Sequence, residues 1–138
     1  MRIGALKLKA QLYCGDELAM GPGKADLLEA IDRRGSISAA ARAMGLSYRR
    51  SWMMVDSMNR CWRDRLVETT AGGGQARGAR LTETGRAVLA AYRALEQRLA
   101  ASAARETLSG LEAMLRSAPL DPHPQPETQP ETRPLPKL

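Results

Sequence analysis

The chain has few of the residues on which catalytic and metal sites depend. Its 138 residues include one histidine, His123, and two cysteines, Cys14 and Cys61. A histidine-based catalytic or zinc site is therefore not expected. The two cysteines make neither a disulfide framework nor a metal site, and we interpret each as a small buried hydrophobic residue in a reducing cytoplasm. No paired carboxylates or nucleophile–base motif is recognisable, so we predict no enzyme activity and no cofactor.

Long hydrophobic runs are also missing. No stretch is long and apolar enough for a transmembrane helix, and the N-terminal residues lack the continuous apolar region of a signal peptide. We therefore expect a cytoplasmic protein without membrane contact. The length suits one compact domain with one core.

Positive charge is abundant and unevenly distributed. The formal net charge is +6, and residues 33–80 contain ten basic and three acidic residues. The excess is thus confined to one segment. A solvated basic face would also explain it, but a local excess is typical of a surface that binds a polyanion.

Residues 36–62 predict two short helices joined by a tight turn. The first is expected over Ser38–Met44, with Ser38 as its N-cap. Gly45 follows where the chain must turn with a positive φ. Ser47 is the predicted N-cap of a second helix, whose apolar face is formed by Trp52, Val55, Met58 and Trp62, with Asn59 beside them. This order is typical of a helix-turn-helix.

The second helix begins with side chains suited to DNA. Arg49 and Arg50 can bind base edges, and Tyr48 can bind a phosphate. The alternative is a plain helical hairpin with solvated arginines. We predict that the helical DNA-binding residues are Ser36, Ser38, Ser47, Tyr48, Arg49, Arg50 and Met53.

Two further elements are expected before this motif. Residues 3–13 alternate between apolar and polar side chains, which predicts one strand. Asp26–Arg34 predicts a helix with Leu27, Leu28 and Ile31 facing inward, ended by Gly35 at its C′ position.

A hairpin is expected after the motif. Residues 66–70 and 80–82 predict two strands, joined by the glycine-rich loop 71–78. The loop spacing fits no nucleotide-binding fingerprint. A plain hairpin tip is possible, but flanking arginines favour a wing that contacts a DNA strand through Gly73, Gly74, Arg77 and Arg80.

The remaining chain predicts one helix over residues 82–117, with Thr82 as its N-cap, and a disordered proline-rich tail over residues 118–138. A helix this long cannot bury its apolar stripe on so small a domain, so the same helix of a second subunit is the simplest partner. The alternative is a helix that folds back at Gly110. The expected homodimer surface is Val88, Tyr92, Leu95, Leu99, Leu108, Leu111 and Leu115.

These elements predict a mainly α (α+β) fold. It consists of a winged helix-turn-helix over residues 1–81, a dimerisation helix over 82–117 and the tail. The expected partner is double-stranded DNA.

The joined motifs resemble the N-terminal DNA-binding domain of ModE-type molybdate-responsive regulators, which are LysR-like winged helices. The likeness covers roughly residues 4–116. It rests on Ser47-Tyr48 with Trp52, Met58-Asn59, the wing glycines 72–74, and Leu81-Thr82 with Gly85.

This resemblance implies a dimeric transcriptional regulator that binds a palindromic operator. It also implies dimer contacts through the first strand region and the last long helix. The proline-rich tail stands where the family has molybdate-binding domains, so we expect no molybdate binding. The alternative function is a truncated module that pairs with another regulator through the long helix.

Overall fold

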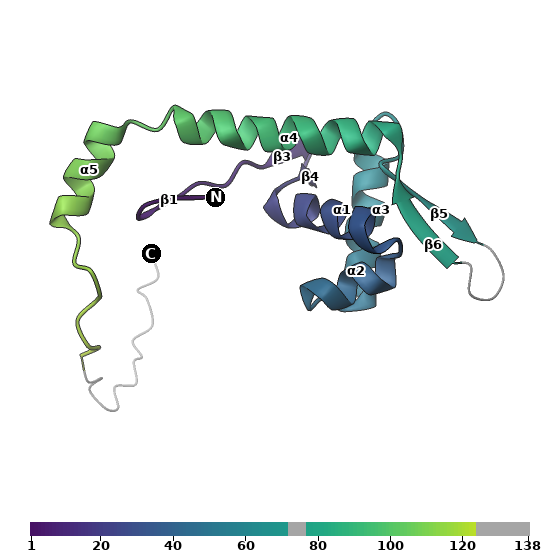
Figure 1. Ribbon diagram of the computed structural model, residues 1–138, viewed down its shortest axis with the longest axis horizontal. Helices are drawn as coiled ribbons and strands as arrows, with labels where there is room; N and C mark the ends of the chain where they lie inside the picture. Colours follow the sequence, from purple (N-terminus) through teal and green to yellow (C-terminus); the bar gives the residue numbers. More distant parts are fainter. Residues whose placement is uncertain (72–76, 124–138) are drawn as a thin grey trace, which may run out of the picture. The chain divides into compact units, whose positions relative to one another are not determined.

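The computed structural model describes residues 1–71 and 77–123. The chain divides into a unit over Met1–Ala104 and a second over Arg105–Leu138. The first unit is a winged helix-turn-helix in which the described residues form three helices, small antiparallel hairpins and a fourth, longer helix (Figure 1). The predicted fold class is confirmed. The predicted tail lies almost wholly outside the described residues.

Three helices build the core of the first unit: α1 (Pro22–Arg34), α2 (Ile37–Met44) and α3 (Tyr48–Cys61). Pro22 stands at the start of α1, where its missing N–H costs nothing. Gly35 ends α1 with a φ of 80°, as predicted. The predicted inward residues of α1 are fully buried, and they share one cluster with Val55 and Met58 of α3.

Three details of these helices differ from the sequence prediction. The N-cap of α2 is Ser36, whose Oγ accepts a hydrogen bond from the Ala39 N–H at 3.1 Å; Ser38 is already inside the helix. Both serines are suitable N-caps. A cap at Ser36 makes Ile37 the first helical residue, and Ile37 is buried there. Trp52, expected in the core, is 39% exposed, and α1 starts at Pro22 rather than at the predicted Asp26.

The N-terminal segment is two hairpins, so the prediction of one strand was wrong. Strands β1 (Arg2–Ile3) and β2 (Leu6–Lys7) form the first hairpin, and β3 (Leu12–Cys14) and β4 (Glu17–Met20) form the second. Gly4 and Gly15 have φ values of 58° and 61°, a conformation that reverses the chain at each turn. The expected burial of the cysteines was also wrong, because Cys14 is exposed and Cys61 is only half-buried.

The predicted wing is confirmed as an antiparallel hairpin of β5 (Val67–Ala71) and β6 (Arg77–Leu81). Asn59 of α3 attaches it to the helices. Its Oδ1 accepts from the N–H groups of Leu66 and Val67 at 2.9 and 3.1 Å, and its Nδ2 donates to the Val67 carbonyl at 3.1 Å. A second attachment runs from the Ala79 N–H to the Gly35 carbonyl at 2.8 Å.

The single helix expected over residues 82–117 is two helices, α4 (Glu83–Ala101) and α5 (Arg105–Met114). Thr82 is the N-cap of α4, as predicted. The break lies at Ser102, whose Oγ donates to the Leu99 carbonyl at 3.0 Å, so that the side chain bonds the backbone of the preceding turn. Gly110, where we expected a register shift or fold-back, lies within α5.

Helix α4 is held against α1 by ion pairs. Arg93 contacts Asp26, Glu29 and Glu96 at 2.8–3.1 Å, and Arg86 contacts Asp32 at 3.3 Å.

Within residues 1–71 and 77–123, no helix is long and apolar enough to cross a membrane.

Candidate nucleic-acid interface

The turn between α2 and α3 presents the N-terminal end of α3 to solvent. Gly45 has a φ of 69°, which closes α2 and redirects the chain. Ser47 caps α3 by accepting a hydrogen bond from the Arg50 N–H at 3.0 Å. Both positions agree with the sequence prediction. The first turn of α3 thereby projects from the domain with a fixed backbone.

The side chains at this end are exposed and basic. Tyr48 and Met53 are 51% and 59% exposed, and Arg49 and Arg50 are exposed as well. Among the residues that the structure describes, the guanidinium groups of Arg49 and Arg50 form no ion pair or hydrogen bond. They are therefore available to an external anion.

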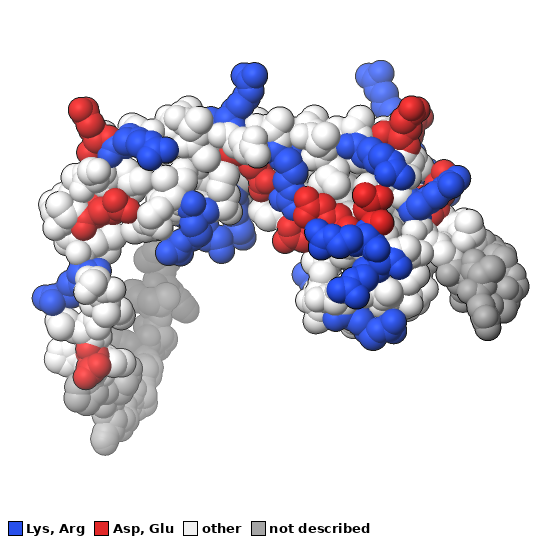
Figure 2. Space-filling model, in the orientation of Figure 1, with Lys and Arg blue, Asp and Glu red and all other residues white. Residues whose placement is uncertain are grey.

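Basic side chains extend this surface onto neighbouring elements. Arg33 and Arg34 end α1, and Arg42 lies in the last turn of α2. Figure 2 shows Lys and Arg side chains gathered over α1 and α2, whereas Asp and Glu concentrate where α1 meets α4. Four acidic residues there, Asp26, Glu29, Asp32 and Glu96, form ion pairs with Arg86 or Arg93 of α4.

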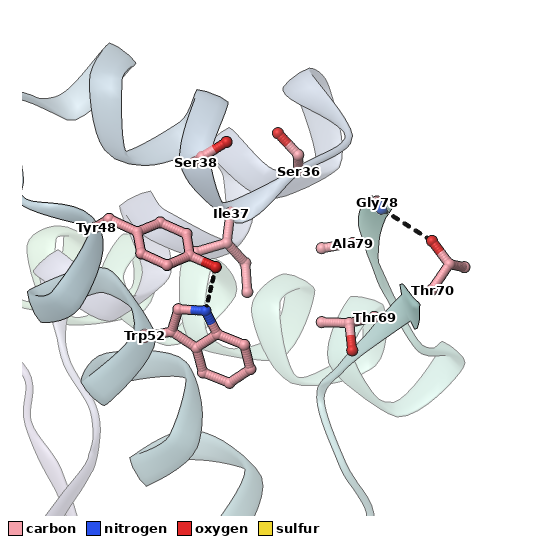
Figure 3. A pocket seen from close by; sticks show the side chains of 9 residues that line it. All are labelled: Ser36, Ile37, Ser38, Tyr48, Trp52, Thr69, Thr70, Gly78 and Ala79. Atoms are coloured by element: carbon pink, nitrogen blue, oxygen red, sulfur yellow. Dashed lines mark hydrogen bonds between the residues drawn. The ribbon is translucent and has the colours of Figure 1, made fainter. Parts of the chain in front are cut away.

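A groove lies between the helix-turn-helix and the wing. Helix α2 contributes its N-terminal end, α3 contributes Tyr48 and Trp52, and the hairpin contributes the opposite wall (Figure 3). Its lining is Ser36, Ile37, Ser38, Tyr48, Trp52, Thr69, Thr70, Gly78 and Ala79. Hydroxyl groups and a helix N-terminus on facing walls are suited to a phosphate backbone.

Tyr48 and Trp52 are arranged together in this groove. They are four residues apart on α3, and the Trp52 Nε1–H donates a hydrogen bond to the Tyr48 hydroxyl oxygen (Figure 3). A phenol can both accept and donate. The indole N–H uses one accepting site of the Tyr48 oxygen, which leaves the phenol O–H able to donate to a ligand.

A second hollow flanks α3 on the side of the β3–β4 hairpin. It brings Lys24 of α1 together with Ser47, Arg49 and Arg50. The Lys24 Nζ donates to the Leu18 carbonyl at 2.8 Å, and burial lowers the pKa of this ammonium group. In this hollow Lys24, Arg49 and Arg50 therefore lie beside the carboxylates of Asp16 and Glu17.

Only some of the predicted DNA-binding residues of the wing lie within the described part of the chain. Gly73 and Gly74 lie outside the described residues, and so does the side chain of Arg77, although its backbone is in β6. Arg80 is 70% exposed by its side chain and lies 3.8 Å from Glu68, which partly neutralises it. Ser36 lines the groove, but its hydroxyl already caps α2.

Sequence reasoning missed Trp52, Thr69, Thr70 and Lys24. Trp52 was assigned to the core on its apolar spacing alone, although it follows Tyr48 by one helical turn. Thr70 accepts a hydrogen bond from the Gly78 N–H at 2.9 Å across the hairpin. Its pairing could be inferred only from the strand register, which the loop length left open.

The predicted dimer stripe is only partly available. Tyr92 is 3% exposed, and its hydroxyl donates to the Ala10 carbonyl at 2.7 Å, so it belongs to the chain's own core. Burial raises its pKa to about 12. Leu95 and Leu99 are 37% and 39% exposed. An apolar groove on α4 is lined by Leu12, Met20, Trp62, Ala87, Val88, Ala91, Tyr92 and Leu95.

In the second unit, α5 carries apolar side chains without a buried residue among those described. Leu111 and Leu115 are 56% and 59% exposed, and Leu108 is half-buried. These leucines are therefore at least partly exposed, as a dimer surface would require.

Comparison with known proteins agrees with this geometry. The model of the bacterial regulatory helix-turn-helix proteins of the lysR family matches residues 24–86, from α1 to the start of α4. Residues 24–86 are a LysR-type helix-turn-helix domain. The crystal structure of the CbnR DNA-binding domain in complex with DNA shares the fold, with a TM-score of 0.50 and 20% identity over 64% of this chain and 95% of that chain.

Relatives of this region include proteins named for molybdenum transport and for molybdenum-pterin binding. The chain is 46% identical over 78 residues to the molybdenum transport protein ModE of Azotobacter vinelandii, covering 56% of this chain and 29% of that protein. It is 43% identical over 102 residues to the molybdenum-pterin-binding protein MopB of Rhodobacter capsulatus, covering 74% and 36%. It is 35% identical over 92 residues to the DNA-binding transcriptional dual regulator ModE of Escherichia coli, covering 67% and 33%. The predicted resemblance is confirmed, and the chain spans about a third of the length of these relatives.

Proposed function

We propose that this chain is a transcriptional regulator that binds double-stranded DNA in a sequence-specific manner, in the cytoplasm. The observation that carries the proposal is the exposed end of α3. Arg49 and Arg50, which form no pair within the described residues, stand there beside a hydroxyl-lined groove that leads to the wing. A helix of this kind enters the major groove with its N-terminal residues, and the wing follows the adjacent backbone.

The two parts of the surface have different tasks. Arg49 and Arg50 are placed to bind base edges, where a bidentate arginine–guanine pair discriminates between bases. Tyr48 and the serine and threonine hydroxyls are placed to bind phosphates, which fixes the register of the protein on DNA without reading sequence. The free N–H groups at the start of α2 and α3 add to phosphate binding.

We further propose that two copies bind a palindromic operator. A single winged helix reads one half-site, whereas two copies related by a two-fold axis read half-sites about 34–36 Å apart or a multiple of that distance. The apolar groove on α4, with Leu95 at its rim, supports a homodimer because burial of such leucines favours association. Leu99 is also exposed on α4, and the second unit offers Leu108 and Leu111 of α5 and the following Leu115 as separate apolar contacts for a partner.

The direct test is selection of a preferred duplex from a random pool, followed by titration of a labelled copy with the full chain. We expect a two-fold symmetric sequence bound at least a thousandfold more tightly than scrambled DNA, which is about the lower limit for specific regulators. Equal affinity for both duplexes over a range of salt concentrations would refute sequence-specific binding.

Assembly is tested separately with Leu95→Asp. A carboxylate at the rim of the α4 groove would be buried without a partner in the dimer, so we expect a monomer with native circular dichroism and lost operator binding. Ala94→Asp, at an exposed neighbouring position of α4, is the matched control. A wild-type chain that is monomeric at tens of micromolar by ultracentrifugation would favour the second candidate function, pairing with another regulator through the exposed leucines of α4 and α5.

A further inference from the structure

The two cysteines come from distant segments and meet beside the C-terminal end of α3. Cys14 is the last residue of β3 and pairs with Glu17 across the hairpin. Cys61 is the last residue of α3 and follows Arg60, whose Nη2 lies 2.9 Å from Oε2 of the same Glu17. The hairpin register and the ion pair therefore place both cysteines close to Glu17.

The orientation of α3 directs Cys61 toward the hairpin. Ser57 precedes it by one helical turn, and residues four apart share a helix face. The Ser57 Oγ donates to the carbonyl of Leu18 in β4 at 3.4 Å, which identifies this face as the one packed on the hairpin. Cys61 therefore lies on the side of α3 that faces the hairpin bearing Cys14, and both thiols are free in this structure.

The two thiols differ in their access to solvent. Cys14 is exposed and Cys61 is half-buried. Burial raises the pKa of the Cys61 thiol, and the neighbouring Cys14 raises it further. A dissolved oxidant therefore reaches Cys14 first, and Cys61 is held beside the product of that reaction.

We propose that Cys14 and Cys61 are a redox-active pair that hydrogen peroxide converts into an intramolecular disulfide. The Cys14 sulfur attacks one peroxide oxygen, which gives a sulfenic acid and releases water. The Cys61 sulfur then displaces the sulfenic oxygen as a second water and forms the S–S bond. In sum, two thiols lose two electrons and two protons, and one peroxide is reduced to two waters. This inference does not depend on DNA binding.

The disulfide fastens β3, the exposed strand of a hairpin whose other strand, β4, is packed into the core through Ala19 and Met20. Strand β3 is exposed throughout, and the exposed Arg60–Glu17 pair that joins the hairpin to α3 stabilises little in water. A covalent link between Cys14 and Cys61 closes a loop that contains β4, α1, α2 and all of α3. Loop closure restricts the unfolded chain, so the oxidised protein is more resistant to denaturant than the reduced protein.

The experiment compares the reduced full chain with the same chain treated with hydrogen peroxide. We expect the free thiol count to fall from two to none, a Cys14–Cys61 crosslinked peptide by mass spectrometry, and a higher urea midpoint that returns to the reduced value with dithiothreitol. A disulfide-linked dimer on a non-reducing gel, or peroxide-treated chains that keep separate oxidised cysteines, would overturn the intramolecular pair.

Two variants test the geometry rather than the mere presence of thiols. In Cys61→Ser the Cys14 sulfenic acid has no thiol to react with, so dimedone labelling of Cys14 should rise well above that of the wild type. The double variant Cys14→Ser with Tyr13→Cys moves the thiol to the opposite face of the strand. We expect no intramolecular disulfide there, and equal crosslinking in this variant and the wild type would overturn the proposal.

Discussion

Both ends of α3 carry arginines, but the arginines at the two ends differ in their contacts with the rest of the domain. At the N-terminal end, Arg49 and Arg50 are exposed and form no side-chain pair with the described parts of the chain. At the C-terminal end, Arg60 contacts Glu17 and Asp56, each at 2.9 Å. One end of the helix is therefore open to a ligand, and the other end is bonded to the domain.

This difference shows that a count of basic residues overstates a binding surface. The excess between residues 33 and 80 includes Arg60 and Arg80, and both have an acidic partner in the chain. An arginine that is already paired gains less from a phosphate, because it must first give up its own partner. The candidate interface is therefore the unpaired subset around the start of α3.

The largest effect is expected at the bonded end, from Asn59→Ala. The change removes three hydrogen bonds that attach the wing to α3, and it leaves the N–H groups of buried Leu66 and Val67 without their acceptor. We expect a loss of about 3 kcal/mol in the free energy of unfolding, measured by urea denaturation. Asn59→Asp keeps the acceptor and should lose clearly less. An unchanged midpoint for Asn59→Ala would show that the wing does not depend on this contact.

Substitutions at the open N-terminal end of α3 should weaken DNA binding and leave stability nearly unchanged. Alanine at whichever of Arg49 and Arg50 reads a base should weaken operator binding by about 1–3 kcal/mol and relax specificity at one base pair. Because neither side chain supports the fold, the urea midpoint should stay nearly constant. The measurement is a titration series on single-base operator variants.

Arg60→Ala is the matched control for this series, since it removes an arginine from the same helix at its bonded end. We expect it to leave sequence preference unchanged. If Arg60→Ala relaxed specificity and both alanine variants at the open end did not, the reading end of α3 would be the other one.

Tyr48→Phe should have a smaller effect on binding. The variant keeps the ring beside Trp52 and removes the hydroxyl, which also accepts a hydrogen bond from the Trp52 indole. We expect about 1 kcal/mol weaker binding to operator and scrambled DNA alike, because phosphate contacts carry no sequence information. Trp52→Phe removes the donor that orients Tyr48, so it should show part of the same loss. A change in base preference with Tyr48→Phe would assign Tyr48 to base reading.

The sequence predicted the elements that local chemistry determines. Gly35, Gly45, Ser47 and Thr82 end or begin helices where expected, because each cap depends on a single residue type. The resemblance to ModE-type domains likewise placed the wing and the exposed end of α3 correctly.

Features set by tertiary packing could not be read in the same way. Tyr92 has the spacing of a dimer stripe, yet its hydroxyl binds the Ala10 carbonyl of the N-terminal segment. The groove of Tyr48, Trp52 and the wing joins residues from three elements, and its shape depends on the hairpin register and on Asn59. Pairing of Arg60 with Glu17 is a contact between distant segments that no local pattern reports.

The smallest expected effect is the pH dependence of the stability that the Arg60–Glu17 pair contributes at the C-terminal end of α3. The hydrogen bond from Arg60 lowers the pKa of Glu17 below its usual 4.5. A carboxyl whose pKa is lowered by folding stabilises the protein above its unfolded pKa, and this contribution is lost as the pH falls through the folded value. The difference in urea midpoint between the wild type and Arg60→Ala should therefore be present at neutral pH, small because the pair is exposed, and should shrink on acidification below about pH 4. Glu17→Gln should show no such pH dependence in its response to Arg60→Ala. A difference that grew on acidification would mean that Arg60 is held mainly by contacts other than Glu17.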